Sequence, residues 1–221
     1  MASGFPQGAP KPLRSGIVLL DPASGQPQRV VVLQYTPASL SRSLQPQWYQ
    51  PVQGDQLVNR NRLNAPPIET IQIEAEVDAT DQLDQPKQFP VEAQNGISHL
   101  LAALETIVYP TTTQLRESNQ RQAAGSLEIA PMEAPMAIFV WNKTRIAPVR
   151  ITEMSISEEF FDLQLNPIRA RVTMSMRVLS VDDLGFQHLG SNIYLRYQDQ
   201  KERLASLVAG GTFGQIGIQR V

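Results

Sequence analysis

Few residues in this 221-residue chain could do acid–base or nucleophilic chemistry. It has two histidines and no cysteine. His99 stands in an apolar segment, and His188 stands in a turn flanked by glycines. Neither has a sequence neighbour that would activate it as a general base. Without cysteine there is no disulfide, thiolate nucleophile or thiolate zinc site. We therefore expect no hydrolytic or redox activity and no catalytic residue.

Two further patterns resemble ligand-binding motifs but lack their context. Residues 210–217 are rich in glycine, yet a dinucleotide loop needs a strand before it and a helix after it. Asp78, Asp81 and Asp84 lack the alternating oxygen ligands and the closing glutamate of a calcium loop. The chain has no phosphate loop, HExxH or GxSxG motif. We expect neither a cofactor nor a bound metal.

Composition narrows the class of protein. The formal net charge is −2, charged residues make up 18% and hydrophobic residues 42% of the chain. These values fit a folded protein and argue against a nucleic-acid-binding protein. The sequence shows no secretion signal and no apolar run long enough to span a membrane. We expect synthesis and assembly in the cytoplasm, without membrane insertion.

The hydrophobic pattern predicts a mainly β protein. Residues 69–81 form the clearest strand, because Ile71, Ile73, Ala75 and Val77 alternate with polar residues. Residues 96–109 form the clearest helix, with Asn95 as N-cap and Pro110 as stop. Further strands are expected at 16–21, 29–36 (a hairpin with the first), 37–44, 136–141, 147–158 and 168–179, and a weaker helix at 199–209, ended by Gly210 and Gly211.

We predict an antiparallel β-sandwich or barrel with one packed helix and long loops. Residues 1–15 are expected to be a flexible tail, and residues 16–180 the β domain. Residues 45–67 and 111–135 are expected to be loops, with a short element at 127–129. Residues 181–221 are expected to be a C-terminal extension.

Two strands carry rows of charge opposite their apolar faces. The acidic row is Glu74, Glu76 and Asp78, and the basic row is Arg169, Arg171 and Arg177. One interpretation is two solvated faces that never meet. The other is charge complementarity between subunits, which gives an interface its register and specificity.

Five segments together resemble the tube-like proteins of contractile injection systems, which are phage tail-like particles. Residues 35–42, with Tyr35, Pro37 and Arg42, resemble the family's aromatic–Asn–Pro–x–Ser/Thr–Leu–x–Arg motif, with Thr36 in place of Asn. Residues 71–81 resemble its alternating strand, and 100–110 its leucine-rich helix ending in proline. Residues 135–141 resemble its strand ending in tryptophan, and 159–171 its Phe–Asp–x–x–Gly–x–Pro–x–Arg–Ala hairpin. The matching residues there are Trp141, Phe161, Asp162, Pro167, Ile168, Arg169 and Ala170.

The sequence departs from the family at three further points. Asn142 replaces the glycine that follows the tryptophan. Asn166 is expected to replace the hairpin glycine, since asparagine also tolerates positive φ. A C-terminal LysM module, which many members carry, is not found, so cell-wall binding is not expected.

The resemblance implies a tube initiator, or hub-to-tube adaptor, of a particle's baseplate. Six copies would form a ring between a trimeric spike hub and the inner tube, in contact with other baseplate proteins. A polymerising inner-tube subunit is an alternative, and a β-rich enzyme is a further one from a different class.

Overall fold

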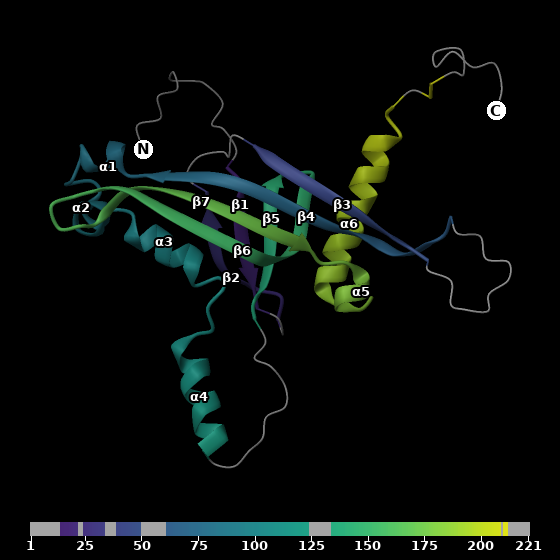
Figure 1. Ribbon diagram of the computed structural model, residues 1–221, viewed down its shortest axis with the longest axis horizontal. Helices are drawn as coiled ribbons and strands as arrows, with labels where there is room; N and C mark the ends of the chain where they lie inside the picture. The colour runs from purple at the N-terminus through teal and green to yellow at the C-terminus, as the bar shows by residue number, and fades with distance from the viewer. Residues whose placement is uncertain are drawn as a thin grey trace.

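The computed structural model describes residues 14–21, 24–33, 39–49, 61–123, 134–208 and 210–211. Within these ranges all seven strands join one antiparallel sheet, in the order β2-β1-β5-β6-β7-β4-β3 (Figure 1). The mainly β prediction is confirmed. Residues 1–13 of the tail expected at 1–15, and the element expected at 127–129, lie outside the described residues. Ser15 is buried, and its carbonyl accepts from the Leu33 N–H.

The strands follow the predicted pattern with shifted ends. The hairpin of β1 and β2 is confirmed by their antiparallel pairing, and the alternating apolar residues of β4 and β7 are buried. The bounds are β1 Gly16–Leu20, β2 Pro27–Val32, β3 Leu40–Trp48, β4 Leu63–Asp78, β5 Met136–Asn142, β6 Arg145–Phe161 and β7 Pro167–Val178.

Strand β6 belongs to both halves of the sheet. Its first residues pair with β5 as far as Val149, and from Val149 onward it pairs with β7. The register shifts between Ile151 and Glu153, and such bulges bend a strand. The β2-β1-β5 part therefore crosses the β7-β4-β3 part, and both contribute to one hydrophobic core (Figure 1).

Apolar residues of both parts fill this core. Ile17 and Phe139 come from β1 and β5, and Ile71, Ile73 and Met176 come from β4 and β7. All five are at most 1% exposed. Their opposite neighbours along each strand face outward, which is the consequence of period-two alternation.

The expected helix at 96–109 is shorter and has a different start. Helix α2 spans Pro90–Asn95 and helix α3 spans Ser98–Glu105. Asn95 is the last residue of α2, so its prediction as the N-cap of the helix was wrong. Between the helices Gly96 has φ +54°, and the Ile97 N–H donates to the Pro167 carbonyl. This contact with β7 sets the boundary, and it is not visible in local sequence.

Two helices differ from the prediction, one in an expected loop and one in its starting residue. Helix α4, Thr112–Ala123, lies in the predicted loop 111–135, and helix α6, Leu189–Ala205, begins well before residue 199. Helix α4 has one large apolar residue, Leu115, so its sequence lacks the apolar stripe that predicts a helix. None of its residues is buried. Helices α1, Thr80–Leu83, and α5, Val181–Leu184, are single turns.

The expected loop at 45–67 is also shorter. Strand β3 continues to Trp48 and β4 begins at Leu63, while residues 50–60 lie outside the described part. Pro46 had indicated a loop. It lies where the β3–β4 register shifts, on a strand at the sheet edge, where proline is tolerated.

Candidate interaction surfaces

The two predicted charged rows lie side by side on the outer face of β4 and β7. The register places Glu76 opposite Arg171 and Asp78 opposite Arg169. The Arg169 Nη2 lies 2.6 Å from the Asp78 Oδ2. The Arg171 Nε lies 3.1 Å from the Glu74 Oε1. The rows therefore meet within one chain.

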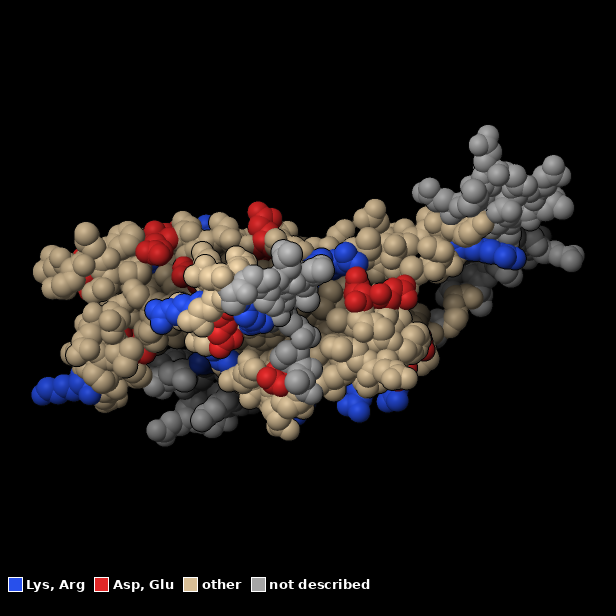
Figure 2. Space-filling model, turned by 90° about the horizontal axis from the view of Figure 1, so that it is seen from below, with Lys and Arg blue, Asp and Glu red and all other residues tan. Residues whose placement is uncertain are grey.

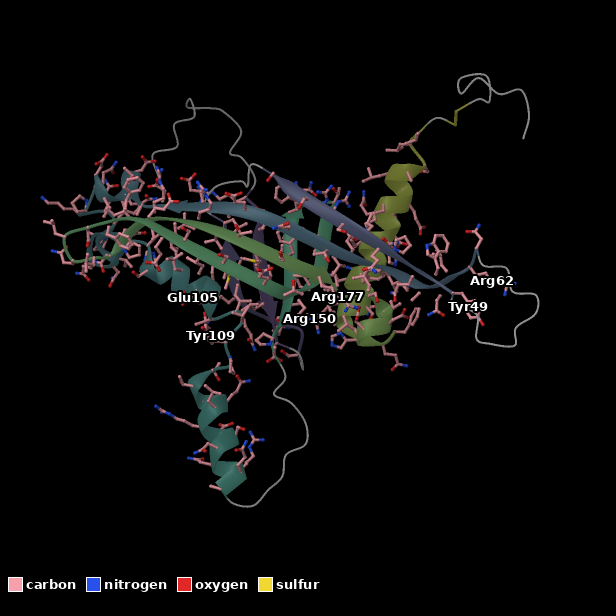
Figure 3. All side chains as sticks on the ribbon, in the orientation of Figure 1. Tyr49, Arg62, Glu105, Tyr109, Arg150 and Arg177 are labelled. Carbon is pink, nitrogen blue, oxygen red and sulfur yellow. The ribbon has the colours of Figure 1, made fainter. Side chains whose placement is uncertain are left out.

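The third arginine of the basic row points to a different partner. Its Nη2 lies 2.7 Å from Asp183, the residue that also closes the capping box of α5 with Ser180. Arg150 lies directly opposite Arg177 on β6 (Figure 3). Like charges on opposed strands repel, so Asp183 offsets part of this repulsion.

The Asp78–Arg169 pair is the partly buried end of the rows. Burial alone would raise the pKa of Asp78, but hydrogen bonds from Thr80 and the Arg169 guanidinium outweigh it and lower that pKa. The Thr80 N–H donates to the Asp78 Oδ1 over 2.7 Å. Asp78 thus joins the end of β4 to the start of α1 and to β7.

The β6–β7 hairpin ends in a rigid turn. The Asp162 carboxylate accepts hydrogen bonds from the Gln164 N–H, the Asn166 N–H and the Asn166 side-chain amide, each 2.8 Å long. That amide also donates to the Gln94 carbonyl at the end of α2. Asp162 and Pro167, both family-motif residues, therefore fix the hairpin and its contact with α2 and α3.

Two bulky residues at the tip of the hairpin, one near the end of β6 and one in the turn, lie in the left-handed region. Phe160 has φ +54° and Leu165 has φ +64°. Asn166 is therefore not the left-handed residue of this turn, and the prediction that it replaces the hairpin glycine was wrong. Counting from Phe161 and Asp162, the motif's glycine position falls on Leu165. A leucine there costs roughly 1–2 kcal/mol of backbone strain.

The hairpin tip is apolar on the outside. Leu163 is 98% exposed and Leu165 is 78% exposed. Phe160 and Phe161 are also exposed, and the Arg169 guanidinium lies 5.6 Å from the Phe160 ring centroid. Exposed large apolar side chains gathered on a rigid turn typically mark a contact site.

A buried carboxylate that was not predicted joins α6 to the sheet. Glu69 on β4 is only 3% exposed. The Tyr197 hydroxyl donates to its Oε1 and the Lys201 ammonium to its Oε2, each over 2.7 Å. The Arg42 Nη1 lies 3.6 Å from Oε1, which gives this family-motif residue its structural partner.

The same cluster raises the pKa of Tyr197. Burial, and then the hydrogen bond to the Glu69 carboxylate, raise the pKa of Tyr197 to about 12. The Lys201 ammonium also lies 3.9 Å from the centroid of the Tyr197 ring. The sequence carried a signal for this cluster, because alternation places Glu69 on the same face as Ile71 and Ile73.

Of the remaining motif residues, those that the structure describes take structural positions. Tyr35 and Pro37 lie outside the described residues. Trp141 on β5 lies against Phe139, with ring centroids 6.2 Å apart, and Ala170 is fully buried. The Asn142 side chain accepts from the Thr144 and Arg145 N–H groups and so shapes the β5–β6 turn.

The described residues form no evident catalytic site. His188 is the N-cap of α6 and accepts from the Gly190 N–H, and His99 lies 3.8 Å from Glu92. Within the described ranges, no group of three or more His, Asp or Glu residues could hold a metal ion. A shallow groove of about 430 Å³ lies between the end of α3, with Glu105 and Tyr109, and β6 (Figure 3).

Charge is mixed over the surface seen in Figure 2, where basic and acidic side chains alternate without a large patch of one sign. None of the helices in the described part of the chain is long and apolar enough to cross a bilayer.

Comparisons with known proteins add a structural likeness. No protein-family model and no curated protein matches the chain. It is similar to a chain of the solved structure "Tail of empty GTA particle computed with helical refinement, C6 symmetry". The TM-score is 0.29 at 13% identity, over 75% of this chain and 90% of that one. A likeness of that size carries no argument about function.

Proposed function

We propose that the protein is a structural component of a phage tail-like contractile injection particle. Within it, six copies form a ring that joins the trimeric spike hub to the inner tube and nucleates tube assembly. The role is mechanical, so no catalytic group is required.

One observation carries the proposal. Residues that resemble the tube-like family fall on β3, β4, α3, β5 and the β6–β7 hairpin, the elements that build both parts of the folded sheet. Asp162 and Ala170 have environments that suit their residue types, since the Asp162 carboxylate closes the turn and Ala170 is buried in the core. Pro167 contacts the start of α3 through its backbone carbonyl. These positions support the proposal.

The charged rows are proposed as part of the interface between copies. Glu74, Glu76 and Arg171 are each more than half exposed although they are paired within the chain. A neighbouring copy can therefore contact them without unfolding the subunit. Adjacent rows of opposite sign favour one register over others.

Electron microscopy of the purified full chain, with its mass in solution, tests the proposal. A hub-to-tube adaptor is expected to form closed six-membered rings that bind the spike hub protein on one side and the tube protein on the other. Long tubes from this chain alone would identify the inner-tube subunit instead. A strictly monomeric chain that binds neither partner would reject both assignments.

A further inference from the structure

We propose that the β6–β7 hairpin tip of one copy docks on an apolar sheet face of a second copy. The tip comprises residues 158–165. The face, termed here the valine face, comprises the outward side chains of β2, β1, β5 and the start of β6. The inference extends the proposed ring by naming the contact between its subunits.

The valine face is continuous across four strands. Val32 lies opposite Gly16, Gly16 opposite Val140, and Val140 opposite Ile146. In the next row Val30 lies opposite Val18. Helix α6 covers only the far end of this side of the sheet, where Ile193 packs against Leu20, Met136 and Ile138. Val30, Val32 and Ile146 remain exposed.

The two surfaces have opposite charge at their margins. Lys143 and Arg145 stand at the β5–β6 turn beside Ile146, and Arg150 lies on the same side of β6. These three have no ion pair within the described structure. The hairpin tip carries Glu158, Glu159 and Asp162 among its apolar residues. An apolar centre with complementary charged margins is the usual anatomy of a protein interface.

The tip is prepared for docking before any partner arrives. The Asp162 hydrogen bonds and the contact with Gln94 hold the turn, so little conformational freedom is lost on binding. Leu165 keeps a bulky apolar side chain at a left-handed position where glycine would be free of strain. Backbone strain that is kept at an exposed residue such as Leu165 suggests that its side chain has a function.

The contact must lie between copies. Ile146 and Phe161 are at opposite ends of β6, separated by about 50 Å along the strand at ~3.3 Å per residue. Figure 1 shows the tip beside α1 and α2, away from β1, β2 and β5. Two different patches meeting head to tail generate a ring when the rotation closes. The acidic tip also disfavours an anionic lipid surface as its partner.

Cysteine crosslinking tests the contact directly, because the native chain has no cysteine. Leu163→Cys is mixed under oxidising conditions with Val30→Cys or with Val32→Cys, so that two registers are sampled. Val108→Cys is the matched control: Val108 is 46% exposed and Val32 is 51% exposed, but Val108 lies beyond α3. We expect the Leu163→Cys variant to crosslink with at least one of the two valine-face variants at roughly tenfold the control yield.

Leu165→Gly separates docking from folding. The change relieves the left-handed strain, so the variant should melt no lower than the native chain. It removes an apolar side chain from the tip, so the crosslink yield of Leu163→Cys should fall several-fold. A lower melting temperature with an unchanged yield would show that Leu165 serves the fold alone and would overturn the proposal.

The other outcomes are equally decisive. Equal crosslinking to Val108→Cys, crosslinking of Leu163→Cys only to itself, or no crosslink to either valine-face position would overturn the contact. So would tip-dependent binding to phosphatidylglycerol vesicles. Rings that form without the crosslink would reject this contact while supporting the proposed function. Crosslinked oligomers that bind no hub or tube protein would do the reverse.

Discussion

At the scale of single residues, Glu69 shows how one polar group organises a distant helix. An ionised carboxylate with 3% exposure is costly unless it is paired and hydrogen-bonded. Here Tyr197 and Lys201 from α6 satisfy both oxygens, so α6 is attached where the carboxylate lies. Tyr194 and Tyr197 add their rings to the core beside it. The hydrogen bonds to Glu69 thus fix where α6 packs on the sheet, and the two tyrosine rings bury apolar surface there.

Tyr197→Phe should change how stability depends on alkaline pH. The pKa of Tyr197 is raised from 10.0 to about 12 in the folded chain, so between these values the unfolded chain has lost a proton that the folded chain retains. Stability from this group is present below pH 10 and is lost as pH rises toward 12. Denaturant unfolding from pH 8 upward should show a steeper loss for the native chain than for Tyr197→Phe. Equal slopes would contradict the raised pKa of Tyr197.

The sequence predicted which single residues are buried where a strand has one face on the core and one face outward. The inward set of β4 is buried as the alternation predicts, and the charged set faces outward. The hairpin glycine position was misplaced because the sequence holds leucine there, and a bulky residue with positive φ has no sequence signal. The ion pairs within the rows also required the register between β4 and β7, which alternation alone does not give.

At the scale of elements, two arginines of β7 pair with carboxylates of β4 in different environments. Asp78, the partner of Arg169, has a side chain only 10% exposed, whereas Arg171 is 59% exposed. Arg169→Glu should destabilise the chain clearly more than Arg171→Glu, since it breaks the charged hydrogen bond to the partly buried Asp78. Arg171→Glu should cost about 0–1 kcal/mol. Thermal melting of the two variants measures the difference.

The Arg171→Glu variant also tests the rows as an interface. A folded Arg171→Glu subunit that fails to form rings would support their use between copies. Normal assembly of that variant would leave the rows with a role inside the subunit only. Arg169→Glu is unsuited to this question because its loss of stability would confound the reading.

Element boundaries were predictable where local chemistry sets them and not elsewhere. The start of α4 has such chemistry: Gln114 and Thr111 bond each other reciprocally, as in a capping box, and the Thr-x-x-Gln spacing is present in the sequence. His188 as the N-cap of α6 is an unusual choice, so that helix was placed too late. The boundary between α2 and α3 depends on a contact with Pro167 and could not be found locally.

At the scale of the molecule, one strand joins the two parts of the sheet and determines how they are arranged. Strand β6 pairs with β5 at one end and β7 at the other, so its bulge determines how the parts fold over each other. The sequence predicted two packed layers but not that one strand would belong to both. No periodicity distinguishes a long bent strand from two short ones, since the alternation merely changes phase at the bulge.

The segment after residue 180 should be required for folding. Helix α6 supplies Tyr194 and Tyr197 to the core and two of the groups that hold Glu69. A chain ending at Leu179 leaves that carboxylate with Arg42 alone, beside newly exposed apolar surface. Removing partners from a buried charge costs about 3–5 kcal/mol, a large share of the 5–15 kcal/mol that typically stabilises a domain. Circular dichroism should show an unfolded or strongly destabilised chain, whereas one ending at Val208 should melt like the full protein. If the chain ending at Leu179 melted normally, residues 181–208 would be a separate extension, and the buried Glu69 cluster would contribute nothing to stability.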